Sequence, residues 1–437
     1  MSNAAAVPLA LAPEPPAGLP SASAGLRYGA LGLPLAFVAL PLYVLLPAHY
    51  ADRYGLPLAA LGAVLLGARL LDALADPLIG RWIDRLFARG AHRAWCAAVA
   101  SALLLAVGFQ ALFFPLVQGQ QALLWWCALD LSVTYLGYSG VAVVHQSWGA
   151  RLGGNEAQRA RVVAWREGAA LIGVLVASLL PSLAGLQWTS ALFAALLAAG
   201  VALLARAPRP AHRPTTHPGA IGLLLPFGVS AFRRLLAVFM VNGIASAVPA
   251  TLVLFFIRDR LQLPAWEPLF LLTYFAAGAL SIPLWLRLVS RFGIARSWLG
   301  GMALAVAAFV WAATLGIGDA GPYLAVCAAS GVALGADLTL PGALLAGVIQ
   351  RAGHGGRAEG AYFGWWNFAT KLNLALAAGV ALPLLDAIGY RSGARDAAAL
   401  DALTIAYCLL PCVLKLAAAA LLWALWLRQA PTESPTS

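Results

Sequence analysis

The sequence contains few charged residues and only two lysines. Of its 437 residues, 10% are charged and 62% are hydrophobic, and the mean hydropathy is +0.83. A soluble domain carries about 25% charged residues. This scarcity of charge excludes an ordinary soluble domain and favours a protein that lies in a bilayer. The lysines, Lys371 and Lys415, both fall in apolar segments, so neither is a loop charge.

Cysteine and histidine are too sparse and scattered for a metal or redox site. The five cysteines all fall in apolar stretches, where a thiol is usually a small hydrophobe. No CxxC pair and no Cys/His cluster is present. No nucleophile–base cluster appears either, and the loops are too short for a catalytic domain. We therefore expect no enzyme activity, no metal and no cofactor.

Apolar stretches long enough to cross a bilayer recur along the chain and predict twelve spans in an all-α membrane protein. They cover residues 30–48, 57–80, 94–117, 121–147, 162–183, 188–205, 233–257, 268–288, 294–316, 321–349, 360–385 and 402–427. The first 26 residues lack Lys and Arg, which makes a signal peptide a poor interpretation and favours a disordered tail. The predicted organisation is a cytoplasmic tail (1–26), a six-helix half (27–205), a cytoplasmic central loop (206–232), a second six-helix half (233–428) and a C-terminal tail (429–437).

Arginine is distributed unevenly between alternate loops. With a cytoplasmic N-terminus, most arginines fall in inner loops, and the few outer ones are offset by acids. The inner-loop arginines are Arg81, Arg85, Arg89, Arg93, Arg151, Arg159, Arg161, Arg166, Arg206, Arg209, Arg213, Arg233, Arg234, Arg287, Arg291, Arg296, Arg351 and Arg357. This positive-inside pattern places both termini in the cytoplasm. It also accounts for the net charge of +11 without nucleic acid, because no basic stretch stands apart from a membrane flank.

Two carboxylates lie one turn apart inside the second predicted span. Asp72 and Asp76 share one helical face with Arg69. Carboxylates persist in hydrocarbon only where they face water, a cation or each other. A salt bridge to Arg69 is the structural alternative, but one Arg cannot neutralise two acids, so a second cation or a shared proton is still needed. The pattern predicts a cation-binding site formed by Asp72 and Asp76.

The two halves repeat a Pro-x-x-x-Arg-x-x-x-Arg pattern at the ends of the second and eighth spans. It begins at Pro77 in the first half and at Pro283 in the second. Two six-helix halves in parallel repeat describe the major facilitator architecture, in which the substrate site lies between the halves. In the copy, Gly278 and Ile282 stand where the first half has its two carboxylates. The fold therefore does not require these acids, which indicates a function in one half.

The run Asp72-Ala-Leu-Ala-Asp-Pro-Leu-Ile-Gly80 resembles the glycoside-pentoside-hexuronide:cation symporters, the melibiose-permease branch of the major facilitator superfamily. Residues 334–341 and 357–371 are similar to the same family. The resemblance implies a multi-pass transporter of the bacterial inner (plasma) membrane that moves a solute together with a cation. It also implies that Asp72 and Asp76 hold the cation and that Lys371 approaches them from the eleventh span.

The chain departs from the melibiose permeases at the positions that hold sugar. Two acids of that branch are replaced by Ala36 and Ala142, and a nearby tryptophan by Gln146. A galactoside substrate is therefore not implied. In the cation motif, Ala75 stands where the melibiose permeases have an Asn, so one side-chain oxygen is missing. Because sodium needs several oxygen ligands, this difference slightly favours a proton over sodium as the coupling cation.

Lys371 is expected to be the counter-ion of the two carboxylates. It lies near the middle of its span, where a snorkelling lysine reaches water poorly, and it shares a polar face with Asn367 and Thr370. Arg69 is the second candidate counter-ion. Lys415 has no such polar companions and is expected to be structural or lipid-facing near an interface.

Other polar residues are candidates for solute contacts and for a gate. The expected solute contacts are Asp130, Tyr138, His145, Trp366, Asn367 and Thr370. His145 is equally consistent with a satisfied core histidine, and Trp366 with a packing residue. The cluster after the second span is expected to form an inner gate from Arg81, Asp84 and Arg85.

The leading hypothesis is a monomeric secondary transporter that moves a small solute with a proton or sodium by alternating access, with sugars and glycosides among the candidates. An exporter or a lipid or amphiphile carrier on the same fold stays open. A non-transporting membrane sensor is a further alternative, but it does not need two buried acids in one half. The expected partners are the solute, the coupling cation and the lipid bilayer, with no nucleic acid.

Overall fold

The computed structural model describes residues 19–210, 222–387 and 396–428, which form helices and no strands. The predicted C-terminal tail, most of the predicted N-terminal tail and residues 211–221 of the predicted central loop lie outside these residues. The first half contains α1 (Ala22–Gly29), α2 (Gly32–Leu40), α3 (Leu46–Tyr54), α4 (Leu58–Ala88), α5 (Ala91–Phe113), α6 (Gln120–Arg151) and α7 (Glu156–Ala205). The second contains α8 (Ser230–Phe255), α9 (Glu267–Phe292), α10 (Ile294–Ala312), α11 (Ala320–Arg351), α12 (Glu359–Ala387), α13 (Ala397–Thr404) and α14 (Leu410–Leu422).

The described helices confirm the predicted fold of two six-helix halves. Helices α1 to α3 run on as one span, as do α13 and α14, and the long α7 contains two spans. Gly185 separates these two, because its φ of 77° interrupts the helix at a value that favours glycine. Among the described residues, ten spans are recognisable from length and apolar composition. Helices α4 and α12, which contain charged residues, bring the number to twelve.

The predicted N-terminal tail is partly wrong, because α1 begins inside it. Ser21 caps this helix, and its hydroxyl accepts a hydrogen bond from the Ala24 N–H at 3.2 Å. A capping side chain satisfies a backbone donor that the first helical turn leaves free.

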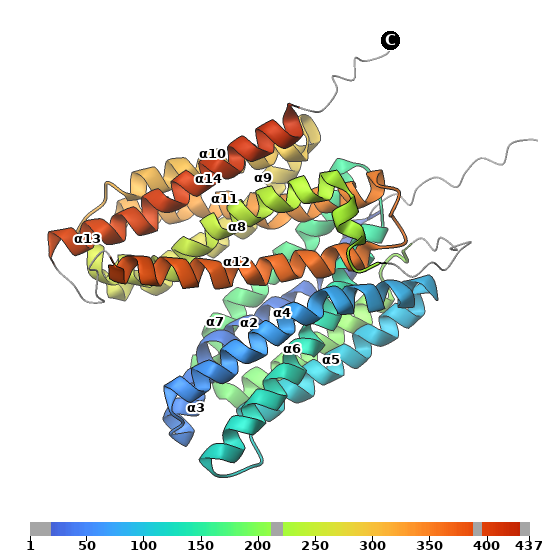
Figure 1. Cartoon of the computed structure of the whole chain (residues 1–437), viewed down its shortest axis with the longest axis horizontal. Coiled ribbons are helices and arrows are strands. Elements are labelled where there is room, and N and C mark those ends of the chain that lie inside the picture. The colour runs from blue at the N-terminus through green and yellow to red at the C-terminus, as the bar shows by residue number, and fades with distance from the viewer. Residues whose placement is uncertain (1–18, 211–221, 388–395, 429–437) are drawn as a thin grey trace, which may run out of the picture.

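The two halves lie beside each other and meet at one end of the molecule. In Figure 1 the blue-to-green helices form the lower half and the yellow-green-to-red helices the upper half, and the halves separate toward the end that carries α3 and α13. We call that end the open end. At the closed end, the last turns of α4 pack against the first turns of α12, and α7 packs against α9 and α11.

Glycines bring α4 and α12 into backbone contact near the closed end. A Cβ atom on Gly80 would lie 2.0 Å from the carbonyl oxygen of Gly360, and one on Gly364 would lie 2.5 Å from the carbonyl oxygen of Asp76. Small residues allow this close approach of membrane helices. The contact places Asp76 directly at the interface between the halves.

We expect Gly360→Ala to weaken the closed end. The new methyl group would lie 2.2 Å from the Gly80 carbonyl oxygen, so the helices must separate, at a cost of about 1–3 kcal/mol to this conformation. Electron–electron resonance between spin labels at Arg89→Cys and Arg351→Cys should show a longer distance population. Gly62→Ala is the matched control, because a Cβ on that α4 glycine meets no atom within 4 Å. Equal distance distributions in both variants would contradict the expectation.

Candidate cation and solute site

Asp72 and Asp76 lie on the face of α4 that turns toward α12. Both are buried, with exposed fractions of 4% and 0%. Lys371 of α12 reaches across from the other half, and its Nζ lies 2.6 Å from Asp72 Oδ2 and 2.7 Å from Asp76 Oδ2. The structure therefore brings together the two acids and the lysine that the sequence singles out.

Ser139 of α6 completes this cluster. Its hydroxyl donates to Asp72 Oδ1 at 2.8 Å, and Lys371 Nζ donates to the Ser139 hydroxyl at 3.0 Å. Oδ1 of Asp76 has no hydrogen-bond partner among the described residues. The sequence gives no sign of Ser139, because a serine in a membrane helix commonly bonds to its own backbone.

The cluster of Asp72, Asp76, Lys371 and Ser139, which we call the central cluster, carries one more negative than positive formal charge. Burial makes an uncompensated charge costly, so the cluster favours one further cation or proton. Five side-chain oxygens converge here, and the two of Asp76 have no hydrogen-bond partner among the described residues, although its Oδ2 pairs with the Lys371 ammonium. This arrangement suits cation binding.

Arg69, the second candidate counter-ion, lies elsewhere on α4. Its guanidinium lies beside the hydroxyl of Tyr135 on α6. The ion pairs of Asp72 and Asp76 are instead made by Lys371. The charges of Asp72 and Asp76 are thus compensated by a residue of the other half. An ion pair with Arg69 would instead have stayed within α4.

Tyr138 is an expected solute residue that lies close to the central cluster. Its ring lies close enough to Asp72, Asp76 and Glu167 for their charges to act on its hydroxyl. Asp130 is half-buried further along α6, near Tyr50 and Cys127. It is therefore separate from the cluster.

The geometry of His145 favours the core alternative over a solute contact. The side chain is completely buried, and its Nε2 lies 2.8 Å from the carbonyl oxygen of Tyr28. The Tyr28 hydroxyl in turn donates to the His145 carbonyl oxygen at 3.1 Å. These two contacts fasten α6 to α1 and leave the imidazole no exposed face.

The three residues of α12 that were expected to contact the solute differ in their surroundings. Trp366 is buried and stacks on Phe239 of α8 with ring centroids 3.7 Å apart, so it packs within the second half. Asn367 is half-buried, and Thr370 is exposed with its hydroxyl donating to the Trp366 carbonyl oxygen at 2.9 Å. Of these three, Thr370 therefore presents the most open surface.

Arg166 and Glu167 of α7 form a partly buried ion pair, whereas the charge pattern predicted Arg166 to be an inner-loop arginine. Their charged atoms lie 2.7 Å apart, with side-chain exposures of 12% and 18%. The helix begins at Glu156, so Arg166 lies roughly 15 Å along it. The signal was present in the sequence, since Asn155 and Gln158 form a capping box that marks this helix start.

The closed end is held by Asp84, Arg151 and Glu359. Asp84 is completely buried and accepts hydrogen bonds at 2.7 Å from the backbone N–H groups of Gly360 and Ala361, at the start of α12. Arg151 Nη2 lies 2.8 Å from Asp84 and 2.9 Å from Glu359. A carboxylate at a helix N-terminus is stabilised by free N–H groups and by the helix dipole.

Of the three residues predicted for the inner gate, Asp84 lies in this cluster. Arg85 is exposed, and Arg81 is half-buried with its Nε lacking a hydrogen-bond partner among the described residues. The cation that pairs with Asp84 is Arg151, which comes from α6 and was predicted to be a loop residue. Asp84 and Arg151 are 67 positions apart in the sequence, so no local sequence pattern indicates that they pair.

The prediction that Lys415 is structural or lipid-facing near an interface is wrong in its lipid-facing form. The side chain is buried, with an exposed fraction of 5%, and pairs with Asp337 of α11. Because these two residues lie far apart along the chain, the sequence alone does not connect them.

Comparisons with known proteins agree with the fold. The chain is similar to a bacterial homologue of the iron transporter ferroportin, solved in an outward-facing state, with 19% identity, a TM-score of 0.66 and coverage of 91% of this chain and 99% of the other. It is also similar to the Escherichia coli fucose:proton symporter FucP, with 13% identity, a TM-score of 0.63 and coverage of 91% and 97%. At these identities the similarity shows the major facilitator fold. No curated protein sequence matches the chain.

A family model described as MFS/sugar transport protein matches residues 26–428, which is nearly the whole described chain. The match includes both halves and every residue of the central cluster. The chain therefore belongs to the MFS/sugar transport protein family and is a membrane transporter by fold and family.

Proposed function

We propose that this transporter moves a small solute together with a proton or sodium by alternating access. The observation that carries the proposal is the central cluster, in which two buried carboxylates from one half share a single lysine from the other half. A cation that binds Asp72 and Asp76 replaces the lysine charge. Cation binding is thereby linked to the contact between α4 and α12, which must change when the halves move.

The proposed cycle follows from charge compensation. Without a cation, Lys371 compensates part of the charge of the two acids, so the empty carrier can reorient. With a cation bound, Lys371 is released from Asp72 and Asp76, because the cation now compensates their charge. Both states avoid leaving two carboxylates uncompensated in a low dielectric.

The proposed solute contacts surround the central cluster. Tyr138 on α6 and the Arg166–Glu167 pair on α7 lie close to it and offer one hydroxyl, one cation and one anion. Such a set suits a small polar molecule with several hydroxyl groups, and the family description favours a sugar. Ala36 and Ala142, which replace the acids expected for a galactoside, favour a different sugar or glycoside.

The proposed location is a bacterial inner membrane, with the closed end at the cytoplasm. The arginine-rich loops support this orientation through the positive-inside rule. The start of α12 lies at this closed end, together with the end of α4, which carries Asp84 and Arg85. In this orientation the open end faces the periplasm.

Proteoliposomes test the proposed function. Vesicles that contain the purified protein and an internal pH dye are exposed to a panel of sugars, glycosides, organic acids and lysolipids, with and without external sodium. We expect one class of solute to drive proton entry, or sodium entry read with a sodium dye. A solute that is transported at the same rate with no cation flux would overturn the coupling while leaving the transporter fold intact.

Lys371→Ala is expected to slow net transport while sparing exchange. Exchange uses only the loaded carrier, whereas net transport requires the empty carrier to reorient with two unpaired carboxylates. One uncompensated carboxylate in a membrane costs about 2.5–3.5 kcal/mol, so net uptake should fall roughly a hundredfold. The measurement compares net uptake with counterflow of the solute found above.

Lys371→Arg separates charge from geometry in this experiment. The guanidinium keeps the positive charge but is larger and planar, so net uptake should recover only in part. If Lys371→Ala reduces exchange and net uptake equally, the lysine is needed by the loaded carrier and the counter-ion role is wrong.

A further inference from the structure

The second half contains a cavity that is separate from the central cluster. It has a volume of about 160 Å³ and lies among α8, α9, α10, α11 and α14, without lining residues from the first half. Its place is toward the open end, since it reaches the early turns of α9 and α11 and the late turns of α8. An engineered cavity of about 150 Å³ is large enough for benzene. The space therefore suits a molecule the size of one six-membered ring.

Six aromatic rings form part of the largely apolar wall of this cavity. The rings that line it belong to Phe270, Tyr274, Phe275, Phe309, Tyr323 and Tyr407. The hydroxyls of Tyr323 and Tyr407 lie 2.7 Å apart and bond to each other. Aromatic walls favour edge and face contacts with another ring.

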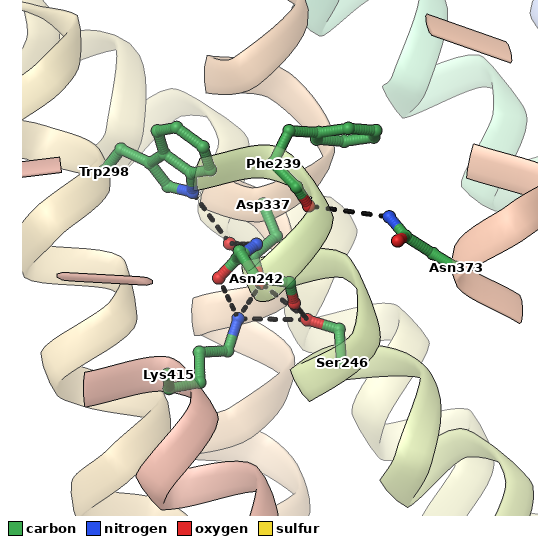
Figure 2. A network of polar contacts seen from close by, with 7 residues as sticks. All are labelled: Phe239, Asn242, Ser246, Trp298, Asp337, Asn373 and Lys415. Carbon is green, nitrogen blue, oxygen red and sulfur yellow. Dashed lines mark hydrogen bonds and ion pairs between the residues drawn. The ribbon is translucent and has the colours of Figure 1, made fainter. Parts of the chain in front are cut away.

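An ion pair between Asp337 and Lys415 forms the polar end of the cavity (Figure 2). Asp337 Oδ1 accepts hydrogen bonds from Trp298 Nε1 at 2.9 Å and from Asn242 Nδ2 at 3.1 Å. Its Oδ2 accepts from the Ser246 hydroxyl at 3.1 Å and from Lys415.

Lys415 is equally well satisfied. Its ammonium donates to Asn242 Oδ1 at 2.8 Å, to the Ser246 hydroxyl at 3.0 Å and to Asp337. An ammonium has three donors, so none is left for a further partner. Asp337 and Lys415 therefore need no additional ion.

The formal charges distinguish this cavity from the central cluster. The central cluster has two acids and one lysine, whereas the cavity has one acid and one lysine. A charged ligand here would have to displace one partner of a buried ion pair, and leaving the other partner uncompensated is strongly unfavourable. A neutral ligand leaves the pair intact.

We propose that the cavity is a second binding site, which takes a neutral ring-sized molecule, aromatic or cyclic, with at most a hydroxyl group. The ring contacts the aromatic walls, and the hydroxyl faces the ion pair and Ser246. The site stands independently of the proposed coupling at Asp72 and Asp76.

The polar network places this site close to the transport machinery. Asn242 and Phe239 lie one turn apart on α8, and the Phe239 carbonyl oxygen is 3.5 Å from Asn373 Nδ2 on α12 (Figure 2). Asn373 comes two residues after Lys371. A ligand in the cavity would thus contact α8, which also packs on α12. The two helices are close at Gly243, where an added Cβ atom would lie 1.9 Å from Asn373 Nδ2.

The test uses three probes of one shape: benzyl alcohol, benzylammonium and benzoate. Binding to the purified full-length protein is measured by ligand-observed nuclear magnetic resonance in a single detergent. We expect saturable binding of benzyl alcohol, and at least tenfold weaker binding of both charged probes. Preferential binding of either charged probe to the unmodified protein would overturn the proposal.

A variant with a filled cavity distinguishes binding at this site from partition of the probe into the detergent micelle. Ala250 lines the cavity on α8 and is exposed, so Ala250→Phe can occupy it without a clash in the core. This variant should lose saturable binding of benzyl alcohol. Val310→Phe on α10 is the control, because Val310 is half exposed and does not line the cavity. Equal binding by both variants would place the probe elsewhere and overturn the proposal.

Removing one charge of the pair should reverse the selectivity. Lys415→Met leaves Asp337 unpaired, and we expect benzylammonium to bind at least tenfold tighter than benzyl alcohol. Asp337→Asn leaves the lysine charge, and we expect benzoate to become the preferred probe. Unchanged ranking of the three probes in both variants would show that the ion pair does not face the bound ligand.

Discussion

Asp76→Asn should reduce uphill accumulation of the solute to the level of simple equilibration. The amide fills the same buried space beside Lys371 but cannot bind and release a cation at this position. The cation gradient then no longer drives the solute, so the ratio of inside to outside concentration should fall to about one. Asp72→Asn should do the same, because both carboxylates contact the one ammonium.

The measurement is solute accumulation in proteoliposomes under an imposed proton or sodium gradient, together with exchange at equal concentrations on both sides. Exchange should persist in part, which separates a loss of coupling from a loss of folding. Asp401→Asn is the matched control, since it makes the same change on an exposed acid of α13 outside the central cluster. Full accumulation by both cluster variants would show that the cation binds elsewhere.

The sequence predicted the central cluster because buried charge is conspicuous in an apolar chain. Asp72, Asp76 and Lys371 are expensive in hydrocarbon, so their presence in predicted spans needed a shared explanation. The repeat then showed that the fold does not require the acids. In the structure, Ile282 stands at the matching place in α9 and packs against Ala164 and Leu171 of α7. At this position the contact between α7 and α9 is thus apolar, whereas the matching contact between α4 and α12 carries charge.

The sequence did not predict contacts that depend on where helices begin or on distant partners. Arg151 and Arg166 resemble loop arginines of the positive-inside pattern, yet both lie within helices and make buried or partly buried ion pairs. Lys415 has no polar neighbour on its own helix, and its partner Asp337 lies on α11. Ser139 is inconspicuous because a serine hydroxyl in a membrane helix can bond to its own backbone and has little energetic cost. Tertiary packing decides each of these cases.

Asp84→Ala is expected to open the closed end. In the present conformation the Asp84 carboxylate accepts two backbone hydrogen bonds from α12, across the boundary between the halves. Hydrogen bonds to a charged group contribute about 1.5–3 kcal/mol each. Their loss should destabilise this conformation by about 3 kcal/mol, which shifts the equilibrium between conformations on the order of a hundredfold.

Thiol labelling of a cysteine at the closed end measures this shift. Ala346 on α11 is buried near the contact between α7 and α11, so Ala346→Cys should label slowly in an otherwise cysteine-free protein. Adding Asp84→Ala should accelerate labelling strongly, whereas Arg85→Ala, one residue further along α4 and exposed, should not. Because Glu359 still pairs with Arg151 after the change, the arginine keeps a partner and the variant should remain folded. Equal labelling rates in the two variants would mean that the closed end is held by the helix contacts at Gly80 and Gly360 alone, and that the carboxylate only caps α12.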